Sequence, residues 1–301
     1  MTFTTQIKDE ITKLDDNTPN SLISLLTYLK FNSTTNNNRL SIFTENASVA
    51  RWIFKLLKSH YNIFINLTIR TIKRFKKRNI YILEIKDKYT IIVNDINNTI
   101  NNIKDSSNEE KIAFLKGIFL SCGSINDPKK NSYHLEFLVK EENDALIIND
   151  VLLSLDFNSK ILKRDKEYMV YLKQAENISD FIKYIGAINN LFYFEDIRIY
   201  KDHKNMVNRL NNCEQANVDK IMRTSKQILD NIKYLEDNDL MILLDDKTKE
   251  IIEYKKKYPE TSLSELSNIV SIETNKPITK SGINHHLRKI NELVNKHKNK
   301  E

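Results

Sequence analysis

The side chains with the clearest chemical use in this chain are basic, amide and hydroxyl groups clustered between residues 280 and 289. Arginine can bind the edge of guanine through two hydrogen bonds, and asparagine can bind adenine in the same way. Lysine and serine instead hold phosphate oxygens, which position a protein on DNA without reading its sequence. We therefore expect Arg288 and Asn284 to read bases, and Lys280, Ser281 and Lys289 to contact phosphates.

Thr279 and His285 complete the set of candidate DNA contacts. Thr279 precedes the cluster, at a position where its hydroxyl can cap a helix. His285 is open between a base contact and a solvated or phosphate-facing position. A base contact would depend on pH, because the unperturbed pKa of histidine is about 6.5.

Two short amphipathic helices, joined by a turn at Pro277, are expected to position the cluster within residues 261–295 or so. Ser262 and Glu265 have the spacing of a capping box. At about 100° per residue, the apolar side chains of each helix then share one face. These side chains are Leu263, Leu266 and Val270 in the first helix, and Ile283, Leu287, Ile290 and Val294 in the second. The pattern is that of a helix-turn-helix, although an ordinary helical hairpin with a solvated basic face shares it.

Basic residues are concentrated in two segments of a chain whose net charge is +7. Residues 274–300 contain seven Lys or Arg and one acid. The other segment is 70–78, where Arg74, Lys76 and Lys77 either track a DNA backbone or keep a strand edge soluble. Two such segments favour a polyanionic partner, most simply double-stranded DNA.

Cysteine spacing and hydropathy exclude several other classes of protein. Cys122 and Cys213 lie far apart and have no second pair, so neither a zinc site nor a disulfide framework is indicated. We expect Cys213 to be a small packed residue rather than a reactive thiol. No apolar run approaches the ~20 residues that span a bilayer, and the N-terminus lacks a signal-peptide core. These features indicate a cytoplasmic protein without a membrane partner, and the expected DNA binding would make it nucleoid-associated.

The first two-thirds of the chain repeats one order of elements, which indicates an internal duplication. The first copy is predicted as strand, helix, strand and strand, at 39–46, 47–60, 63–71 and 79–85. The second copy is predicted in the same order, with a further helix, at 133–139, 143–155, 159–163, 168–172 and 178–188. Short strands mixed with helices at these spacings predict an α+β fold.

An apolar helix is predicted before each copy, at 21–31 and 109–121. Gly117 lies inside the second helix. Because glycine there costs about 1 kcal/mol relative to alanine, we expect it to permit close approach of a neighbouring helix. Two such helices, each leading one half, resemble the LAGLIDADG homing endonuclease fold, in which paired helices form the interface between halves. In that fold, an acid at each helix end binds a divalent metal ion over DNA.

The resemblance places Cys122 where the second acid would stand, and the first helix has no acid near its end at Asn32. Mg²⁺ requires hard oxygen ligands, usually carboxylates. Asp127 lies nearby but has no counterpart in the first half. We therefore expect that the protein is not an enzyme, and that it has no catalytic residue, metal ion, cofactor or small-molecule substrate. A metal-dependent endonuclease is the least favoured alternative.

Four ordered segments extend the resemblance over nearly the whole chain, at 115–124, 132–136, 208–217 and 279–289. They are similar to motifs of the WhiA family of bacterial sporulation and cell-division regulators, in which a degenerate LAGLIDADG-like domain precedes a helix-turn-helix. The resemblance implies a DNA-binding protein acting in transcription, cell division and chromosome segregation, with transcription or cell-division proteins as further partners. The chain departs from the family pattern at Asn32, and at His286, where arginine is expected.

The resulting expectation is a LAGLIDADG-like domain in two halves, 1–105 and 106–190, then a linker at 191–212 and a helical DNA-binding domain at 213–301. The N-terminal domain would add nonspecific DNA contacts or dock proteins. The alternative function is a structural or adaptor protein of the division apparatus that binds DNA only nonspecifically.

Overall fold

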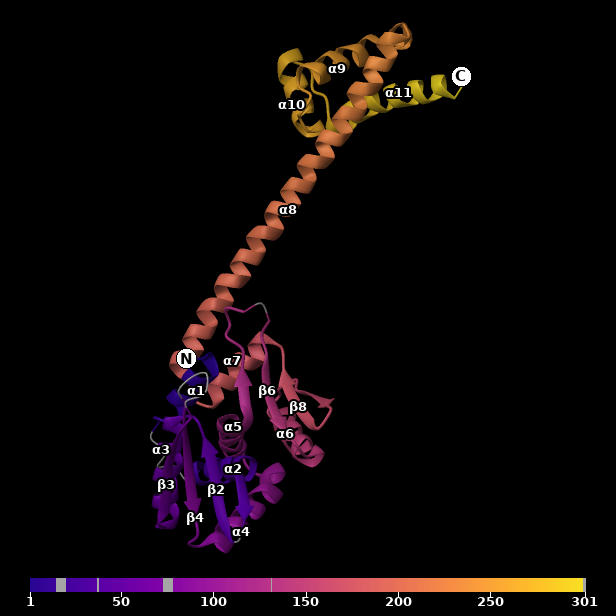
Figure 1. Cartoon of the computed structure of the whole chain (residues 1–301). Helices are drawn as coiled ribbons and strands as arrows, with labels where there is room; N and C mark the ends of the chain where they lie inside the picture. The colour runs from indigo at the N-terminus through magenta and orange to yellow at the C-terminus, as the bar shows by residue number, and fades with distance from the viewer. Residues whose placement is uncertain (15–19, 37, 73–77, 131, 300–301) are drawn as a thin grey trace. The chain divides into compact units, whose positions relative to one another are not determined.

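The chain forms two units with separate cores, Met1–Asp202 and His203–Glu301, in the computed structural model (Figure 1). The structure describes residues 1–14, 20–36, 38–72, 78–130 and 132–299. None of the helices in these ranges is both long and apolar enough to cross a membrane.

Each half of the N-terminal unit contains a four-stranded antiparallel sheet, and both sheets have the same topology. The orders are β1-β2-β4-β3 and β5-β6-β8-β7. The strands of the first sheet are β1 (Ser33–Asn36), β2 (Arg39–Thr44), β3 (Ile65–Ile72) and β4 (Arg78–Ile85). Those of the second are β5 (Gly123–Ile125), β6 (Leu135–Val139), β7 (Lys160–Arg164) and β8 (Glu167–Leu172). The shared order confirms the predicted duplication and the α+β class.

Alternation along the strands turns one face of each sheet towards the core. In β6, Leu135, Phe137 and Val139 are buried, whereas the residues between them are partly exposed. The helices that follow β2 and β6 are α3 (Ala47–Tyr61) and α6 (Glu142–Ser154). The strand-to-helix junctions predicted from the sequence are therefore present in both halves.

Two helices with buried middle turns, α2 (Asn20–Asn32) and α5 (Asn108–Cys122), run side by side between the sheets (Figure 1). A Cβ added at Gly117 would lie 2.4 Å from the backbone oxygen of Ser24. The Ser24 hydroxyl donates a hydrogen bond of 2.8 Å to the Ala113 carbonyl across the same contact. The close approach expected at Gly117 is confirmed.

Several elements of the N-terminal unit were not predicted. They include α1 (Phe3–Ile11), α4 (Tyr89–Asn102), a 3-10 turn (Ile103–Asp105), and the short strands β1 and β5. The helix predicted at 178–188 is α7 (Ala175–Tyr184), so its predicted end was wrong. Gly186 has a φ of 84°, a left-handed conformation that stops the helix and turns the chain.

The helix α8 (Ile188–Asp237) contains the residues expected as a linker, 191–212, and continues into the C-terminal unit. That unit is completed by a 3-10 turn (Leu240–Leu243), α9 (Asp246–Lys257), α10 (Leu263–Thr274) and α11 (Lys280–Lys298). Its core joins the end of α8 to these three helices, through side chains such as Ile232, Ile252, Leu266 and Leu287. Cys213 is exposed on α8, so the expectation of a packed thiol was wrong.

Candidate nucleic-acid interface

Side-chain caps fix where α10 and α11 begin. The Ser262 hydroxyl accepts from the Glu265 backbone N–H at 3.2 Å, and the Glu265 carboxylate accepts from the Ser262 N–H at 2.8 Å. The predicted capping box is therefore formed. The Thr279 hydroxyl accepts from the Gly282 N–H at 3.2 Å and caps α11. Thr279 thus has a structural role at the start of the basic helix.

The turn between α10 and α11 is held by the Ser271 hydroxyl. It accepts from the Ile278 N–H at 2.9 Å and lies 2.7 Å from the Ser267 carbonyl, to which it donates. Asn275 ends α10 in the left-handed conformation. The predicted apolar stripes of both helices meet beneath this turn, where Val270 and Ile283 are buried. The two helices thus form the supported hairpin that a helix-turn-helix requires.

Five of the predicted contact residues form one exposed face along the first half of α11. They are Lys280, Ser281, Asn284, His285 and Arg288. The Arg288 side chain is 70% exposed, and its guanidinium lies 3.5 Å from the Glu292 carboxylate. Such an exposed pair is weak, so Arg288 can exchange it for another acceptor. This face carries charge and hydrogen-bonding groups without supporting the core.

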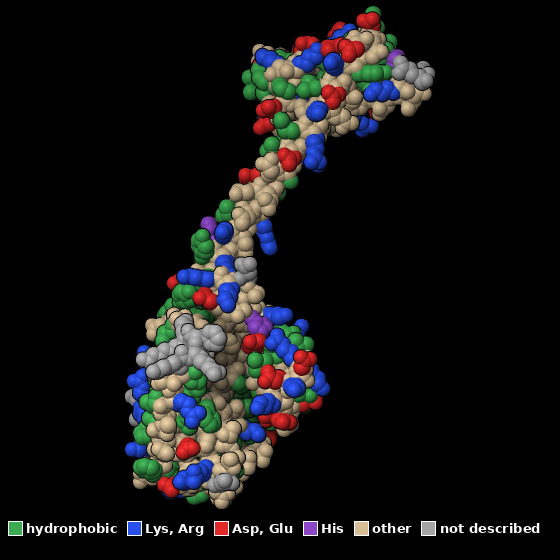
Figure 2. Space-filling model, viewed as in Figure 1, with side chains coloured by type: hydrophobic (Ala, Val, Ile, Leu, Met, Phe, Trp, Pro, Cys, Tyr) green, Lys and Arg blue, Asp and Glu red, His purple; other side chains and the backbone are tan. Residues whose placement is uncertain are grey.

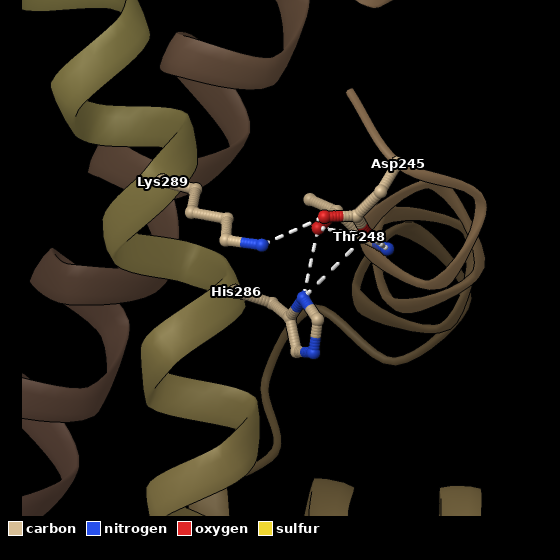
Figure 3. A network of polar contacts seen from close by, with 4 residues as sticks. All are labelled: Asp245, Thr248, His286 and Lys289. Carbon is tan, nitrogen blue, oxygen red and sulfur yellow. Dashed lines mark hydrogen bonds and ion pairs between the residues drawn. The ribbon is translucent and has the colours of Figure 1, made fainter.

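Lys289 lies beside this face and is turned towards α9 (Figure 3). Its ammonium donates to Asp245 Oδ2 at 2.7 Å. Asp245 also caps α9, because its Oδ1 accepts from the Thr248 N–H at 2.8 Å. The Lys289 hydrogen bond, followed by those from Thr248, holds the pKa of Asp245 well below its usual range. A phosphate contact at Lys289 would therefore compete with an internal carboxylate.

His286 extends the same polar network (Figure 3). Its Nδ1 lies 2.8 Å from the Thr248 hydroxyl, which itself donates to Asp245. A hydroxyl has only one proton, so both bonds form when Nδ1 carries the hydrogen. Burial lowers the pKa of His286, which favours the neutral ring. His286, one of the two departures from the family pattern, therefore links α11 to α9.

The other predicted DNA contacts, Arg74, Lys76 and Lys77, lie outside the described residues. Basic and acidic side chains are interspersed on the face of the N-terminal unit seen in Figure 2, and no continuous basic surface covers it. Of the two predicted basic segments, the structure therefore describes the one on α11.

The ends of the paired helices α2 and α5 carry groups that do not suit a divalent metal ion. Asn32 donates to the Tyr28 hydroxyl at 2.6 Å. Burial raises the pKa of the Cys122 thiol to about 11, so the thiol stays protonated at neutral pH. Lys8, whose pKa burial lowers to about 8, adds a cation beside that thiol. No set of three His, Cys, Asp or Glu side chains that could hold a metal ion occurs in the described part of the chain.

A duplicated LAGLIDADG-like domain, followed by a helical unit that ends in a helix-turn-helix, defines the class of protein. Three family models match in chain order. They are the WhiA N-terminal LAGLIDADG-like domain at 21–100, the WhiA LAGLIDADG-like domain at 111–204 and the WhiA C-terminal HTH domain at 207–294. The chain belongs to the WhiA family.

Similar proteins cover almost the full length of the chain. Relatives named "Probable cell division protein WhiA" from Bacillus cytotoxicus and Bacillus cereus are each 40% identical, over 98% of this chain and 97% of theirs. The crystal structure of full-length DUF199/WhiA from Thermatoga maritima aligns with a TM-score of 0.59 at 21% identity, covering 98% of this chain and 99% of that one. The alignment supports the fold.

Proposed function

We propose that this protein is a DNA-binding regulator of cell division that acts through α11 and is not an enzyme. The observation that supports this proposal most directly is the exposed face of α11, which is held in place by a capped turn and a buried apolar stripe. The names of the relatives support the link to cell division. The protonated Cys122 thiol and the amide of Asn32 support the absence of nuclease chemistry.

In this proposal α11 enters the major groove with its N-terminal half. Asn284 and Arg288 are four residues apart on one face and read neighbouring bases. Lys280 and Ser281 hold phosphates at the start of the helix, and His285 lies between the two groups. Lys289 reaches a phosphate only after leaving Asp245.

The wider roles are part of the same proposal. The protein associates with the nucleoid, and its effect on division and chromosome segregation is exerted through transcription. The N-terminal unit adds nonspecific DNA contacts, with Arg74, Lys76 and Lys77 as its candidates, or docks transcription or division proteins.

Replacing Arg288 tests the proposal directly. We expect Arg288→Ala to weaken binding to a preferred duplex by about 1–3 kcal/mol and to relax the preference at one base pair. Arg223→Ala is the matched control, because it removes an exposed side chain of the same type from α8. Fluorescence anisotropy over a series of salt concentrations measures both variants. Equal weakening of every duplex by both variants would instead identify a nonspecific adaptor.

The absence of enzymatic activity has its own test. Supercoiled plasmid should stay intact when incubated with the protein and Mg²⁺ or Mn²⁺, because Asn32 and Cys122 lie at the helix ends where a carboxylate would be needed. Nicking that is abolished by a chelator would contradict this part of the proposal.

A further inference from the structure

A cavity of about 510 Å³ lies within the C-terminal unit, away from the base-reading residues of α11. Its walls come from α8, the end of α9, the first turn of α10 and Lys280 at the start of α11. The volume falls within the range of about 300–1,000 Å³ that is typical of sites for small organic molecules. The proposed DNA-reading function leaves this cavity unexplained.

All the charged side chains in the cavity wall are basic. They are Lys220 on α8, Lys255 on α9 and Lys280 on α11, and no Asp or Glu is among the described residues that line it. Three ammonium groups around one cavity produce a positive potential that attracts an anion.

Lys255 is the least expected of the three. Lys255 is only 2% exposed, and its ammonium donates to the carbonyls of Pro259 and Thr261 at 3.0 and 3.1 Å. Within the described ranges, no carboxylate pairs with it. A buried charge without a counter-charge is costly, and burial lowers the pKa of Lys255 accordingly. A bound anion would supply the missing counter-charge.

The rest of the wall divides into a polar side and an apolar side. Ser262 caps α10 and Ser264 lies in its first turn, where the helix dipole favours negative charge. The Glu265 carboxylate already accepts from the Ser262 N–H, so an anion would face the N–H groups of Leu263 and Ser264. Ile221, Ile228 and Leu263 form an apolar side. The cavity therefore suits a molecule with an anionic group at one end and an apolar body at the other.

We propose that this cavity binds a phosphate group attached to a small apolar body. The phosphate oxygens accept hydrogen bonds from Lys220, Lys255 and Lys280 and face the first turn of α10, and the body packs on the isoleucines. Binding of a free phosphorylated molecule requires no DNA, so the inference goes beyond the proposed function. The other source of the same group is the backbone of bound DNA, which Lys280 also approaches in that function.

Calorimetric titration of the full-length protein, without DNA, tests the free source. The probes are inorganic phosphate and phenyl phosphate, whose ring is a small apolar body, with sodium chloride of the same ionic strength as the reference. We expect phenyl phosphate to bind, and to bind with about tenfold lower affinity or worse in Lys220→Glu and Ser264→Glu. Both changes are at exposed positions, and an acid in the first turn of a helix does not impair folding. Lys226→Glu, an exposed α8 lysine outside the cavity, should bind as the unmodified protein does.

Duplex binding by the same three variants tests the DNA source. If neither free probe binds, weaker duplex binding by Lys220→Glu and Ser264→Glu than by Lys226→Glu identifies the DNA backbone as the source of the phosphate. The proposal is overturned if neither probe binds and all three variants bind DNA equally. It is also overturned if Lys226→Glu lowers the affinity for phenyl phosphate as much as the cavity variants do. None of these outcomes depends on base reading by Arg288, so failure here leaves the proposed function to its own test.

Discussion

Replacing Asp245 with asparagine separates two interactions that the same carboxylate makes. One oxygen caps α9 through the Thr248 N–H at 2.8 Å, and the other accepts from Lys289 at 2.7 Å. Asparagine keeps an oxygen for the cap but loses the charge that holds Lys289. Asp246→Asn is the matched control, because Asp246 is exposed, adjacent, and without a hydrogen bond or ion pair to any described residue.

The expected effect on stability is small and the expected effect on DNA binding is larger. Asparagine caps helices about as well as aspartate, so the cap contributes almost no change. The ion pair joins side chains that are 39% and 47% exposed, and its loss lowers the free energy of unfolding by only about 0.5 kcal/mol. A unit charge about 4 Å away in water is worth about 1 kcal/mol. Freeing Lys289 from Asp245 should therefore raise DNA affinity about fivefold.

Amide hydrogen exchange in α9 and fluorescence anisotropy with duplex DNA measure the two effects. We expect α9 protection to change little in Asp245→Asn and to fall clearly in Asp245→Ala, which also removes the cap. The gain in DNA affinity should exceed that of Asp246→Asn, which changes the net charge equally. Weaker DNA binding by Asp245→Asn would refute the competition and show that the pair holds α11 in its binding position.

Three further predictions concern stability. Gly117→Ala should destabilise the N-terminal unit, because overpacking against the fixed Ser24 carbonyl costs about 1–3 kcal/mol and exceeds the ~1 kcal/mol gained in helix propensity. The fluorescence of the buried Trp52 during urea unfolding measures this loss of stability, and an unchanged midpoint would count against the close approach. Gly282→Ala should stabilise the C-terminal unit by up to about 1 kcal/mol, since its nearest neighbour is a movable isoleucine side chain at 3.1 Å, and a loss of helical circular dichroism at lower urea would contradict this. His286 has a lowered pKa, so its contribution to stability is complete above about pH 6.5 and is lost as the pH falls below that value. If the urea midpoint of His286→Asn depends on pH as strongly as that of the unmodified protein, His286 is not the cause of the pH dependence.

The elements that the sequence predicted well are those with a strong local signal. The capping box at Ser262, the stripe on α11 and the apolar pair of helices each depend on residues within a few turns of one another. Gly117 stands out because an apolar helix rarely contains glycine without a packing reason. In each case local pattern and tertiary packing agree.

Other elements were missed because their local signal is weak. β1 is four polar residues, Ser-Thr-Thr-Asn, so its pairing depends on β2 and not on hydrophobic alternation. α4 starts at a left-handed Lys88 that forms no side-chain cap. The helix of the second copy was predicted to begin at residue 143, whereas α6 begins at Glu142, after Glu141.

Only the exposed face of α11 in the candidate site could be predicted from the sequence. The face of α11 follows from periodicity, but the Lys289 partner, Asp245, lies 44 residues earlier and has no sequence signal. Lys255 is one of three consecutive lysines that resemble a solvated run. A signal was nevertheless present, because Thr248, Ile251, Ile252 and Lys255 have helical spacing and form the buried face of α9.

Selection of bound duplexes from a random DNA library tests the central claim most directly. The full-length protein should enrich a defined sequence, because in our proposal Asn284 and Arg288 read bases from the exposed face of α11. Arg288→Ala should enrich the same sequence with the preference at one base pair lost, and Arg223→Ala should enrich the sequence unchanged. A library that stays random with the unmodified protein, or a sequence that is identical in Arg288→Ala, would contradict DNA reading by α11.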